Sequence, residues 1–390
     1  FRSQLKFFPG AHNLCAPGGL NLLLQVMFVT GKVGKIKVLI VDDSALMRKA
    51  LKEIILTDPS LEVVGTARNG QDAIEKVHDL KPDVVTMDIN MPVMDGLTSM
   101  QHILSDFPEM PVLMVSSLTE EGALTTFEAL ELGAFDYIAK PSGTVSSNIH
   151  IVGKELIQKV KMAYKNANKR NLRNRSQRLR RATVHKKPAI QEKNDFPAGN
   201  GLSKVVVIGI STGGPGTLME VLPMLPRDLP AALIIIQHMP PSFTSSFAKR
   251  LNAACNIPIK EAEAGDILQN GMGYLAPGGY QMVVRGEKGI IRLTSTPKTP
   301  FMPCVDVTME SVLDTFGGRR VVGVLMTGMG DDGADAMVKI RKAGGITIAE
   351  DESTAVVFGM PREAIERGGA EIVAPSYRVA DEIIKAVNRG

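Results

Sequence analysis

Short apolar runs that alternate with helical segments constrain the fold of this chain more than any other feature. Each run is bounded by polar residues, Gly or Pro, and is short enough to be a strand. Five of them occur early in the chain: Ile36–Val41, Val63–Ala67, Val84–Met87, Val112–Val115 and Tyr137–Ala139. Strands that alternate with helices predict a doubly wound parallel sheet of the α/β class. In such sheets ligands bind beyond the carboxyl ends of the strands, so the residues that follow each run are candidates for chemistry.

Polar residues follow four of these runs: Asp42 and Asp43, then Asp88, Ser116 and Lys140. Three carboxylates in one cleft repel each other unless a cation lies among them, and Mg²⁺ prefers carboxylate oxygens. A neighbouring ammonium and a hydroxyl suit an incoming phosphoryl group. The pattern predicts a magnesium-dependent phosphoryl site, although any one of the acids alone could cap a helix.

These residues belong to motifs that resemble the response-regulator receiver domain. The motifs are Asp42-Asp43-Ser44, Asp88-Ile-Asn90-Met-Pro92, Val-Ser116-Ser117 and Lys140-Pro141. The resemblance covers the block from residue 36 to 164 and implies a flavodoxin-like fold. It implies that Asp88 accepts a phosphoryl group from a chemotaxis histidine kinase. It also implies two sets of supporting residues: Asp42, Asp43, Asp88 and the Asn90 carbonyl around Mg²⁺, and Ser116, Tyr137 and Lys140 as the switch.

A strongly basic segment follows this block. Between Lys161 and Asp195 there are twelve Lys or Arg and two acids, so this segment accounts for the positive net charge of the chain, +4. Helical periodicity decays after Tyr164, and Pro and Gly follow. Because interleaved aromatic residues are lacking, we interpret residues 165–203 as a basic flexible linker and not as a nucleic-acid site.

The second block begins with a β-branched strand, Val205–Gly209, that ends in a glycine-rich turn. A dinucleotide-binding turn needs Gly at its second position, where this chain has Ser211. The hydrolase pattern G-x-S-x-G fits Gly209, Ser211 and Gly213, and it presents a hydroxyl on a sharp strand-to-helix turn. Ser211 is therefore a candidate nucleophile, although a serine in such a turn is often only structural.

A nucleophilic serine needs a base, and a base needs an orienting acid. His238 follows the next strand, Leu233–Gln237, and would emerge beside Ser211 if the two strands are neighbours. A third strand, Arg320–Met326, leads to three acids: Asp331, Asp332 and Asp335. The residue pattern alone leaves open which of them would orient the histidine, and a helix cap is an alternative for each.

The second block, residues 204–390, resembles the catalytic domain of the chemotaxis protein-glutamate methylesterases. The motifs are Ile208-Gly-Ile-Ser211-Thr212-Gly-Gly, Gln237-His238-Met-Pro, Ala276-Pro277-Gly278 and Thr327-Gly-Met329-Gly-x-Asp332-Gly. The resemblance implies a Rossmann-like domain with a small β-hairpin insertion. It implies a Ser211, His238 and Asp332 triad, with Thr212 and the Met329 N–H beside the oxyanion.

The two resemblances together imply a phosphorylation-activated hydrolase of bacterial chemotaxis adaptation. It would demethylate glutamate γ-methyl esters on methyl-accepting chemotaxis receptors and deamidate receptor glutamines. Mg²⁺ would serve phosphorylation only, and ester hydrolysis would need no cofactor. We expect a cytoplasmic protein that inserts into no membrane and binds no nucleic acid, and its three separated cysteines suit a reducing compartment.

Other interpretations differ in testable ways. A DNA-binding regulator would need a compact helical reader, which the second block lacks. A nicotinamide-dependent enzyme would need an acid about 20 residues beyond the glycine turn, where none fits well. A non-catalytic scaffold stays open.

Residues 1–35 begin at Phe1 and contain an apolar run, Leu20–Val29, that is too short to span a bilayer. We interpret them as an extension of unknown role.

Overall fold

The computed structural model describes residues 34–140, 149–177 and 202–389. Two parallel sheets and one antiparallel hairpin make up its strands. The predicted extension at residues 1–35 lies almost entirely outside the described residues. We describe the two α/β domains separately.

The first domain has a five-stranded parallel sheet in the order β2-β1-β3-β4-β5. Its strands are β1 (Ile36–Val41), β2 (Leu61–Ala67), β3 (Val84–Asp88), β4 (Val112–Ser116) and β5 (Asp136–Ala139). Its helices are α2 (Ala45–Leu56), α3 (Gly70–Leu80), α4 (Gly96–Asp106), α5 (Glu120–Glu131) and α6 (Ile149–Gln177). The strand order reverses between β1 and β3, which is where a doubly wound sheet binds its ligand.

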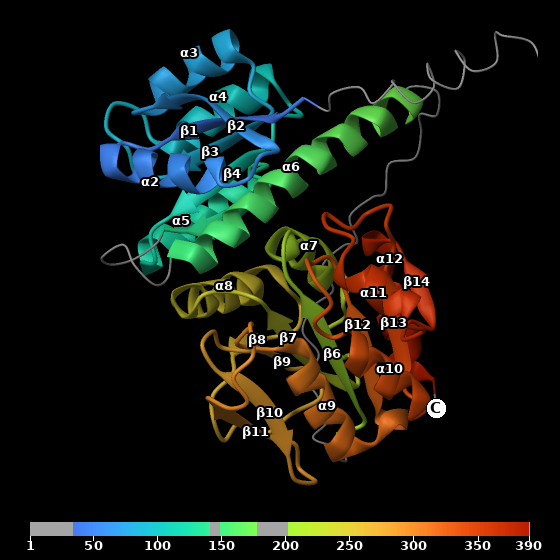
Figure 1. Ribbon diagram of the computed structural model, residues 1–390. Helices are drawn as coiled ribbons and strands as arrows, with labels where there is room; N and C mark the ends of the chain where they lie inside the picture. The colour runs from blue at the N-terminus through green and yellow to red at the C-terminus, as the bar shows by residue number, and fades with distance from the viewer. Residues whose placement is uncertain (1–33, 141–148, 178–201, 390) are drawn as a thin grey trace, which may run out of the picture. The chain divides into compact units, whose positions relative to one another are not determined.

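Alternate residues of β1 supply two separate cores, as the two-residue period of a strand requires. Val38 and Ile40 pack in the cluster that holds Leu51 of α2 and Leu156 of α6. Leu39, the residue between them, packs with α3 and α4. Figure 1 shows α2 on one side of this sheet and α3 with α4 on the other. Burial on both faces explains why the strand reads as a continuous apolar run.

The backbone of α6 is helical as far as Gln177, so the helix extends into the segment that we interpret as a flexible linker. Lys, Arg, Leu and Ala are good helix formers, and they can continue a helix that has no apolar face left to bury. The decay of periodicity after Tyr164 therefore does not mark the end of the helix.

The second domain has a seven-stranded parallel sheet in the order β14-β13-β12-β6-β7-β9-β8. Its strands are β6 (Lys204–Ile210), β7 (Ala231–Gln237), β8 (Ile259–Glu261), β9 (Gly273–Leu275), β12 (Val321–Leu325), β13 (Ile346–Glu350) and β14 (Ile372–Ala374). Later strands add on both sides of β6, so the order reverses there. Both sheets are doubly wound and parallel, which confirms the predicted fold class.

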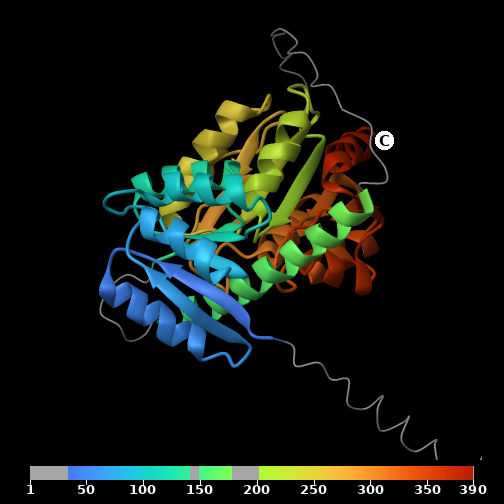
Figure 2. The ribbon, with the colours of Figure 1, turned by 90° about the horizontal axis from the view of Figure 1, so that it is seen from above.

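Helices cover both faces of this sheet. They are α7 (Gly214–Val221), α8 (Pro241–Ala254), α9 (Val305–Phe316), α10 (Ala334–Lys342), α11 (Met360–Glu366) and α12 (Ser376–Asn388), with 3₁₀ turns at Leu222–Met224 and Gly318–Arg320. Val206 and Ile208 of β6 pack with α7 and α12, while Val205 and Val207 pack with α9 and α10. Figure 2 shows α7 and α8 side by side along the sheet.

The predicted hairpin insertion is present as β10 (Gln281–Arg285) paired antiparallel with β11 (Ile290–Thr294). Helix α9 packs against β10. The segment between β11 and α9 returns the chain to the carboxyl edge of the parallel sheet, where it contacts the residues described below.

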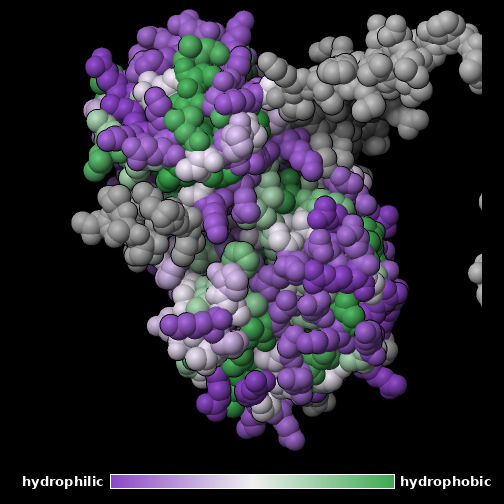
Figure 3. Space-filling view, viewed as in Figure 1, coloured by the Kyte–Doolittle hydropathy of each residue, from purple (hydrophilic) through white to green (hydrophobic). Residues whose placement is uncertain are grey.

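Hydrophilic side chains cover most of the face shown in Figure 3, with hydrophobic ones scattered among them. Among the described residues, no helix combines the length and the apolar character that crossing a membrane would require.

Candidate functional site

The parallel register of β6 and β7 places Ser211 and His238 at the same level of the second sheet. Ile210 pairs with Gln237, so the next residue of each strand emerges at one edge. On the other side of β6, Leu325 of β12 pairs with Gly209. The strands that precede the histidine and the three acids, β7 and β12, therefore lie on either side of β6, the strand that precedes the serine.

Two hydrogen bonds join Ser211, His238 and Asp332 into one chain. His238 Nδ1 lies 3.2 Å from Ser211 Oγ, and His238 Nε2 lies 2.8 Å from Asp332 Oδ2. A carboxylate can only accept, so Nε2 carries the proton and Nδ1 is left to accept from the serine hydroxyl. The two ring nitrogens are used in the opposite sense to those of the chymotrypsin triad. The geometry suits general-base activation of a serine.

Asp332 accepts further hydrogen bonds at the start of α9. The backbone N–H groups of Val305 and Asp306 donate to it over 2.8 and 3.0 Å, and the Cys304 thiol donates over 3.0 Å. Burial alone would raise the pKa of Asp332, but the hydrogen bonds, chiefly from His238, outweigh it and hold that pKa below its ordinary value. Asp332 therefore stays a carboxylate while it caps a helix.

The two other acids after β12 have a different partner. Arg367 donates to Asp331 over 2.6 Å and to Asp335 over 2.8 Å, at the surface of the domain. Of the three candidates that the sequence pattern left open, Asp332 is the one that contacts His238. The pairing with Arg367 also explains how a second carboxylate can lie next to Asp332 in the chain without facing the histidine.

The turn that carries Ser211 is tied to the loop after β12. Ser211 N–H donates to the Thr327 carbonyl over 2.9 Å, and the Thr327 hydroxyl donates to the Thr212 carbonyl over 2.9 Å. Gly328 lies so close that a Cβ there would be 2.9 Å from Ser211 Cβ and 2.2 Å from Met360 Sδ. Gly213 has φ of +76°, a left-handed conformation that glycine adopts without strain.

Two residues that support this turn were not singled out from the sequence. Gln237 Nε2 donates to the carbonyls of both Ser211 and His238, each over 3.0 Å. The fully buried Glu350 accepts from Thr327 N–H over 2.8 Å and from Thr354 Oγ1 over 3.0 Å. Burial raises the pKa of Glu350 to about 7. Gln237 ends β7 and Glu350 ends β13. A polar residue at the end of an apolar strand was the sequence feature that could have identified them as candidates.

The predicted oxyanion residues lie beside the turn. Thr212 follows Ser211 and is buried, and we find no protein acceptor for the Met329 N–H among the residues that the structure describes. A backbone N–H without an acceptor is what an oxyanion site requires.

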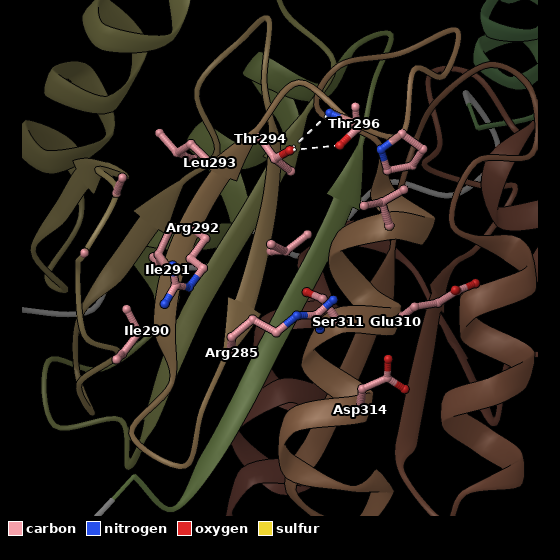
Figure 4. A pocket seen from close by; sticks show the side chains of 15 residues that line it. Arg285, Ile290, Ile291, Arg292, Leu293, Thr294, Thr296, Glu310, Ser311 and Asp314 are labelled. Carbon is pink, nitrogen blue, oxygen red and sulfur yellow. Dashed lines mark hydrogen bonds between the residues drawn. The ribbon is translucent and has the colours of Figure 1, made fainter.

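A groove of about 840 Å³ lies elsewhere in this domain, between the hairpin and α9. Figure 4 shows Arg285 and Arg292 on the hairpin side and Glu310 and Asp314 on α9. None of the residues that we predicted for chemistry lines it.

In the first domain, Asp42, Asp43 and Asp88 form one acidic cluster at the β1–β3 reversal. Their carboxylate oxygens lie within 4.8 Å of one another. Lys140 Nζ lies 3.0 Å from Asp42 and 2.8 Å from Asp88. Burial raises the pKa of Asp88, and Asp42 adds to this while Lys140 opposes it. One ammonium does not balance three carboxylates, and this oxygen donor set fits Mg²⁺.

Helix capping does not account for these acids. Ser44 caps α2, since its hydroxyl accepts from Met47 N–H, and Asp95 caps α4. Asp42 Oδ1 instead accepts from Ser44 N–H over 2.9 Å.

Three further residues of this domain were predicted to take part: Asn90, Ser116 and Tyr137. Asn90 is exposed two residues after Asp88. Buried Ser116 accepts from Thr126 Oγ1 over 2.8 Å. Tyr137 lies on β5, with Lys159 Nζ 5.2 Å from the centre of its ring.

Comparison with known protein families gives two matches. Residues 38–147 match the response regulator receiver domain, and residues 206–383 match the CheB methylesterase family.

Relatives match over nearly the whole chain. A protein named protein-glutamate methylesterase/protein-glutamine glutaminase from Caldanaerobacter subterraneus subsp. tengcongensis is 53% identical, over 91% of this chain and 97% of that protein. One of the same name, numbered 3, from Syntrophomonas wolfei is 54% identical, over 91% of this chain and all of that protein (100%). The crystal structure of the Thermotoga maritima CheB methylesterase catalytic domain is 39% identical, covers 48% of this chain and 99% of that one, and has a TM-score of 0.45. The chain therefore belongs to the protein-glutamate methylesterase/protein-glutamine glutaminase family, hydrolases whose catalytic domain here follows a response regulator receiver domain.

Proposed function

We propose that this chain hydrolyses γ-methyl esters of glutamate on methyl-accepting chemotaxis receptors in the cytoplasm, and deamidates receptor glutamines by the same chemistry. The observation that supports this most is the pair of hydrogen bonds through His238, 3.2 Å to Ser211 and 2.8 Å to Asp332. It joins side chains that follow three neighbouring strands.

In the proposed reaction, Ser211 Oγ attacks the ester carbonyl while His238 Nδ1 takes its proton. Asp332 keeps Nε2 protonated and favours the imidazolium that forms. The negative charge that develops on the carbonyl oxygen is stabilised by backbone N–H groups at Thr212 and Met329. His238 then gives its proton to the leaving methoxide, which departs as methanol.

Water completes the cycle. His238 takes a proton from a water molecule, and the resulting hydroxide attacks the acyl-enzyme. His238 returns this proton to Ser211 Oγ as the acyl C–O bond breaks, and the glutamate loses its proton to solvent and leaves as the carboxylate. With a glutamine side chain the same steps release ammonia in place of methanol.

We further propose that Asp88 accepts a phosphoryl group from a histidine kinase and that its phosphorylation activates the esterase. An acyl phosphate is labile, which suits a reversible switch. Asp42, Asp43, Asp88 and the Asn90 carbonyl would hold Mg²⁺, which supplies charge neutralisation to the incoming phosphoryl oxygens. Lys140 lies within 2.8 Å of the acceptor carboxylate and would pair with the phosphoryl group, while Ser116 and Tyr137 would transmit the change.

The esterase is tested by the intact mass of a methylated chemoreceptor cytoplasmic fragment after incubation with the protein. We expect loss of methyl groups with the wild type and none with Ser211→Ala. The matched control is Ser242→Ala, since this serine follows His238 in the chain and its hydroxyl has no hydrogen-bond partner among the described residues. It should demethylate like the wild type. No loss with wild type, even with Mg²⁺ and a phosphodonor, would contradict the proposal.

A further inference from the structure

An aromatic ring lies flat against the histidine of the proposed triad. The rings of Phe301 and His238 are stacked, with centroids 4.2 Å apart and planes 6° apart. The edge of the imidazole is occupied by its hydrogen bonds to Ser211 and Asp332. Phe301 therefore covers a face of the same ring whose edge would carry the proton transfer.

Phe301 belongs to a segment that we call the strap, residues 296–303, between β11 and α9. Figure 4 shows where it begins: Thr296 donates its N–H to Thr294 Oγ1 over 3.1 Å at the end of β11. The strap has no regular secondary structure of its own. One backbone hydrogen bond holds its far end, from Gly279 N–H to the Met302 carbonyl over 2.8 Å, and side chains supply other contacts.

The buried amide of Gln281 makes several of these contacts. Gln281 is the first residue of β10 and is fully buried, with 0% exposure. Its Nε2 donates to the Pro297 carbonyl over 3.0 Å and to Thr299 Oγ1 over 2.7 Å, with the Phe301 carbonyl at 3.4 Å. An amide nitrogen has two N–H groups, and here both are used on the strap.

The other end of the same amide reaches the acid of the triad. Gln281 Oε1 accepts from Cys304 N–H over 2.8 Å, and the Cys304 thiol donates to Asp332. Gln281 thus fixes the backbone on both sides of His238: at Phe301, which stacks on its face, and at Cys304, which contacts its carboxylate partner.

We propose that Phe301, held in place by Gln281, is a positioning residue that fixes the plane of the His238 ring and stabilises its protonated form. This inference rests on the proposed esterase function. When His238 takes the Ser211 proton, the ring becomes a cation against an aromatic face, and such contacts favour the charged form. An aliphatic side chain would fill the same space without that attraction, and it would leave the ring freer to turn about its Cβ–Cγ bond.

The stacking predicts a selective effect on chemistry. In Phe301→Leu we expect kcat to fall about 3- to 30-fold, the range that corresponds to a cation–π contact. KM should change less than about twofold, because the proposed role of the ring is its contact with His238. Phe301→Tyr keeps the ring and should keep kcat within about twofold of the wild type.

Gln281 supplies a second variant. Gln281→Met removes the hydrogen bonds that the Gln281 amide makes to the strap, and it should lower kcat in the same direction as Phe301→Leu. If both act through the stacked ring, the double variant should lose little more than the worse single variant. Tyr280→Leu is the matched control, since Tyr280 is the neighbouring aromatic residue, is 50% exposed and makes no stacking contact among the described rings. It should behave like the wild type.

The experiment measures kcat and KM for demethylation of the methylated receptor fragment by the full-length variants, and the rate at which a fluorophosphonate labels Ser211. Labelling reports activation of the serine without receptor docking, so Phe301→Leu should slow both kcat and labelling. Unchanged labelling and kcat, a change in KM alone, or equal loss in Leu and Tyr variants would overturn the inference. A wild type that labels and demethylates no faster than Ser211→Ala would instead defeat the esterase proposal, and this inference with it.

Discussion

Asp332 has two tasks at once, because it accepts from His238 and also from two backbone N–H groups of α9. Its neighbours Asp331 and Asp335 have neither, since both pair with Arg367. The position of a carboxylate after a strand end is therefore insufficient for a role beside the histidine. Asp332 differs from them because the start of α9 lies close enough for its backbone N–H groups to donate to the Asp332 carboxylate.

Asp332→Asn should separate these two tasks. The N–H groups of Val305 and Asp306 donate to different oxygens of Asp332, so the single amide oxygen of Asn can still accept from one of them. The side chain no longer carries the charge that favours an imidazolium. We expect kcat to fall by about three to four orders of magnitude, while the free energy of unfolding changes by less than about 1 kcal/mol. Demethylation rates and urea titrations measure the two effects.

Asp332→Ala is the companion variant. It also removes the cap of α9 and should cost about 1–2 kcal/mol of stability in addition. Equal stability of the Ala and Asn variants would contradict the capping role of Asp332.

At the residue scale the sequence pattern predicted Ser211 and His238 as neighbours but left three acids open. The choice depends on where α9 begins in space relative to the loop after β12, which no local pattern encodes. The same holds for Phe301 and Gln281, whose contacts are made across an irregular segment. The family resemblance, and not the spacing, pointed to Asp332. The catalytic roles of these residues stay predictions.

At the scale of elements, α9 and α10 cap each other. Asp332, from the turn before α10, accepts from the first N–H groups of α9. In return Asp306, in the first turn of α9, accepts from Ala336 N–H of α10 over 2.8 Å. Neither helix has a side-chain cap from its own N-cap residue. The starts of the two helices therefore depend on each other.

Asp306→Ala should test this reciprocal capping. Loss of the acceptor leaves Ala336 N–H unpaired and should lower the free energy of unfolding by about 1–2 kcal/mol. Asp306→Asn keeps an acceptor and should cost less. The control is Asp314→Ala, an exposed acid on the same helix, which should stay within about 0.5 kcal/mol of the wild type in chemical denaturation.

The elements themselves were largely predictable. The five early strands, the central strands of the second sheet and their parallel, doubly wound arrangement follow from short buried runs between helical segments, and the structure confirms them. The length of α6 was not predictable from periodicity, because its last part has no apolar face to signal it. The prediction of the hairpin rested on the family resemblance and not on the residue pattern.

At the scale of the whole molecule, two buried carboxyls make stability depend on pH. Burial raises the pKa of Glu350 from 4.5 to about 7 and that of Asp306 from 3.8 to about 6. A raised folded-state pKa means that the unfolded chain releases its proton first as pH rises. The contribution of these two protonated carboxyls to the free energy of unfolding is complete below about pH 4. It decreases as pH rises from the pKa of the unfolded chain to that of the folded protein, and it is lost by about pH 7.

Glu350→Gln should remove the larger part of this dependence. The amide can still accept from Thr327 N–H but does not titrate. Relative to the wild type, the variant should gain stability between pH 5 and pH 8, by on the order of 3 kcal/mol. Urea titrations across that range measure it. A difference between variant and wild type that stays constant with pH would show that Glu350 does not titrate in this range.

Phosphorylation should also act on the whole molecule. A small-molecule phosphodonor with Mg²⁺ should add one labile phosphoryl group to the wild type, seen by intact mass, and raise its demethylation rate. Asp88→Ala should take up none and show no rise.

We further expect deletion of the residues before Lys204 to raise basal hydrolysis, because the receiver would restrain the esterase until it is phosphorylated. An unchanged or lower rate in the shortened chain would contradict restraint by the receiver, even if Asp88 is the acceptor.

The reciprocal capping of α9 and α10 also bears on how such a protein could change through evolution. A lineage that no longer needs the esterase can lose Ser211 freely, because that hydroxyl supports no other part of the fold. It cannot lose Asp332 as easily, since the start of α9 depends on it. Inactive descendants should therefore keep the acid long after the nucleophile has gone, and an acid without a serine would identify a former enzyme.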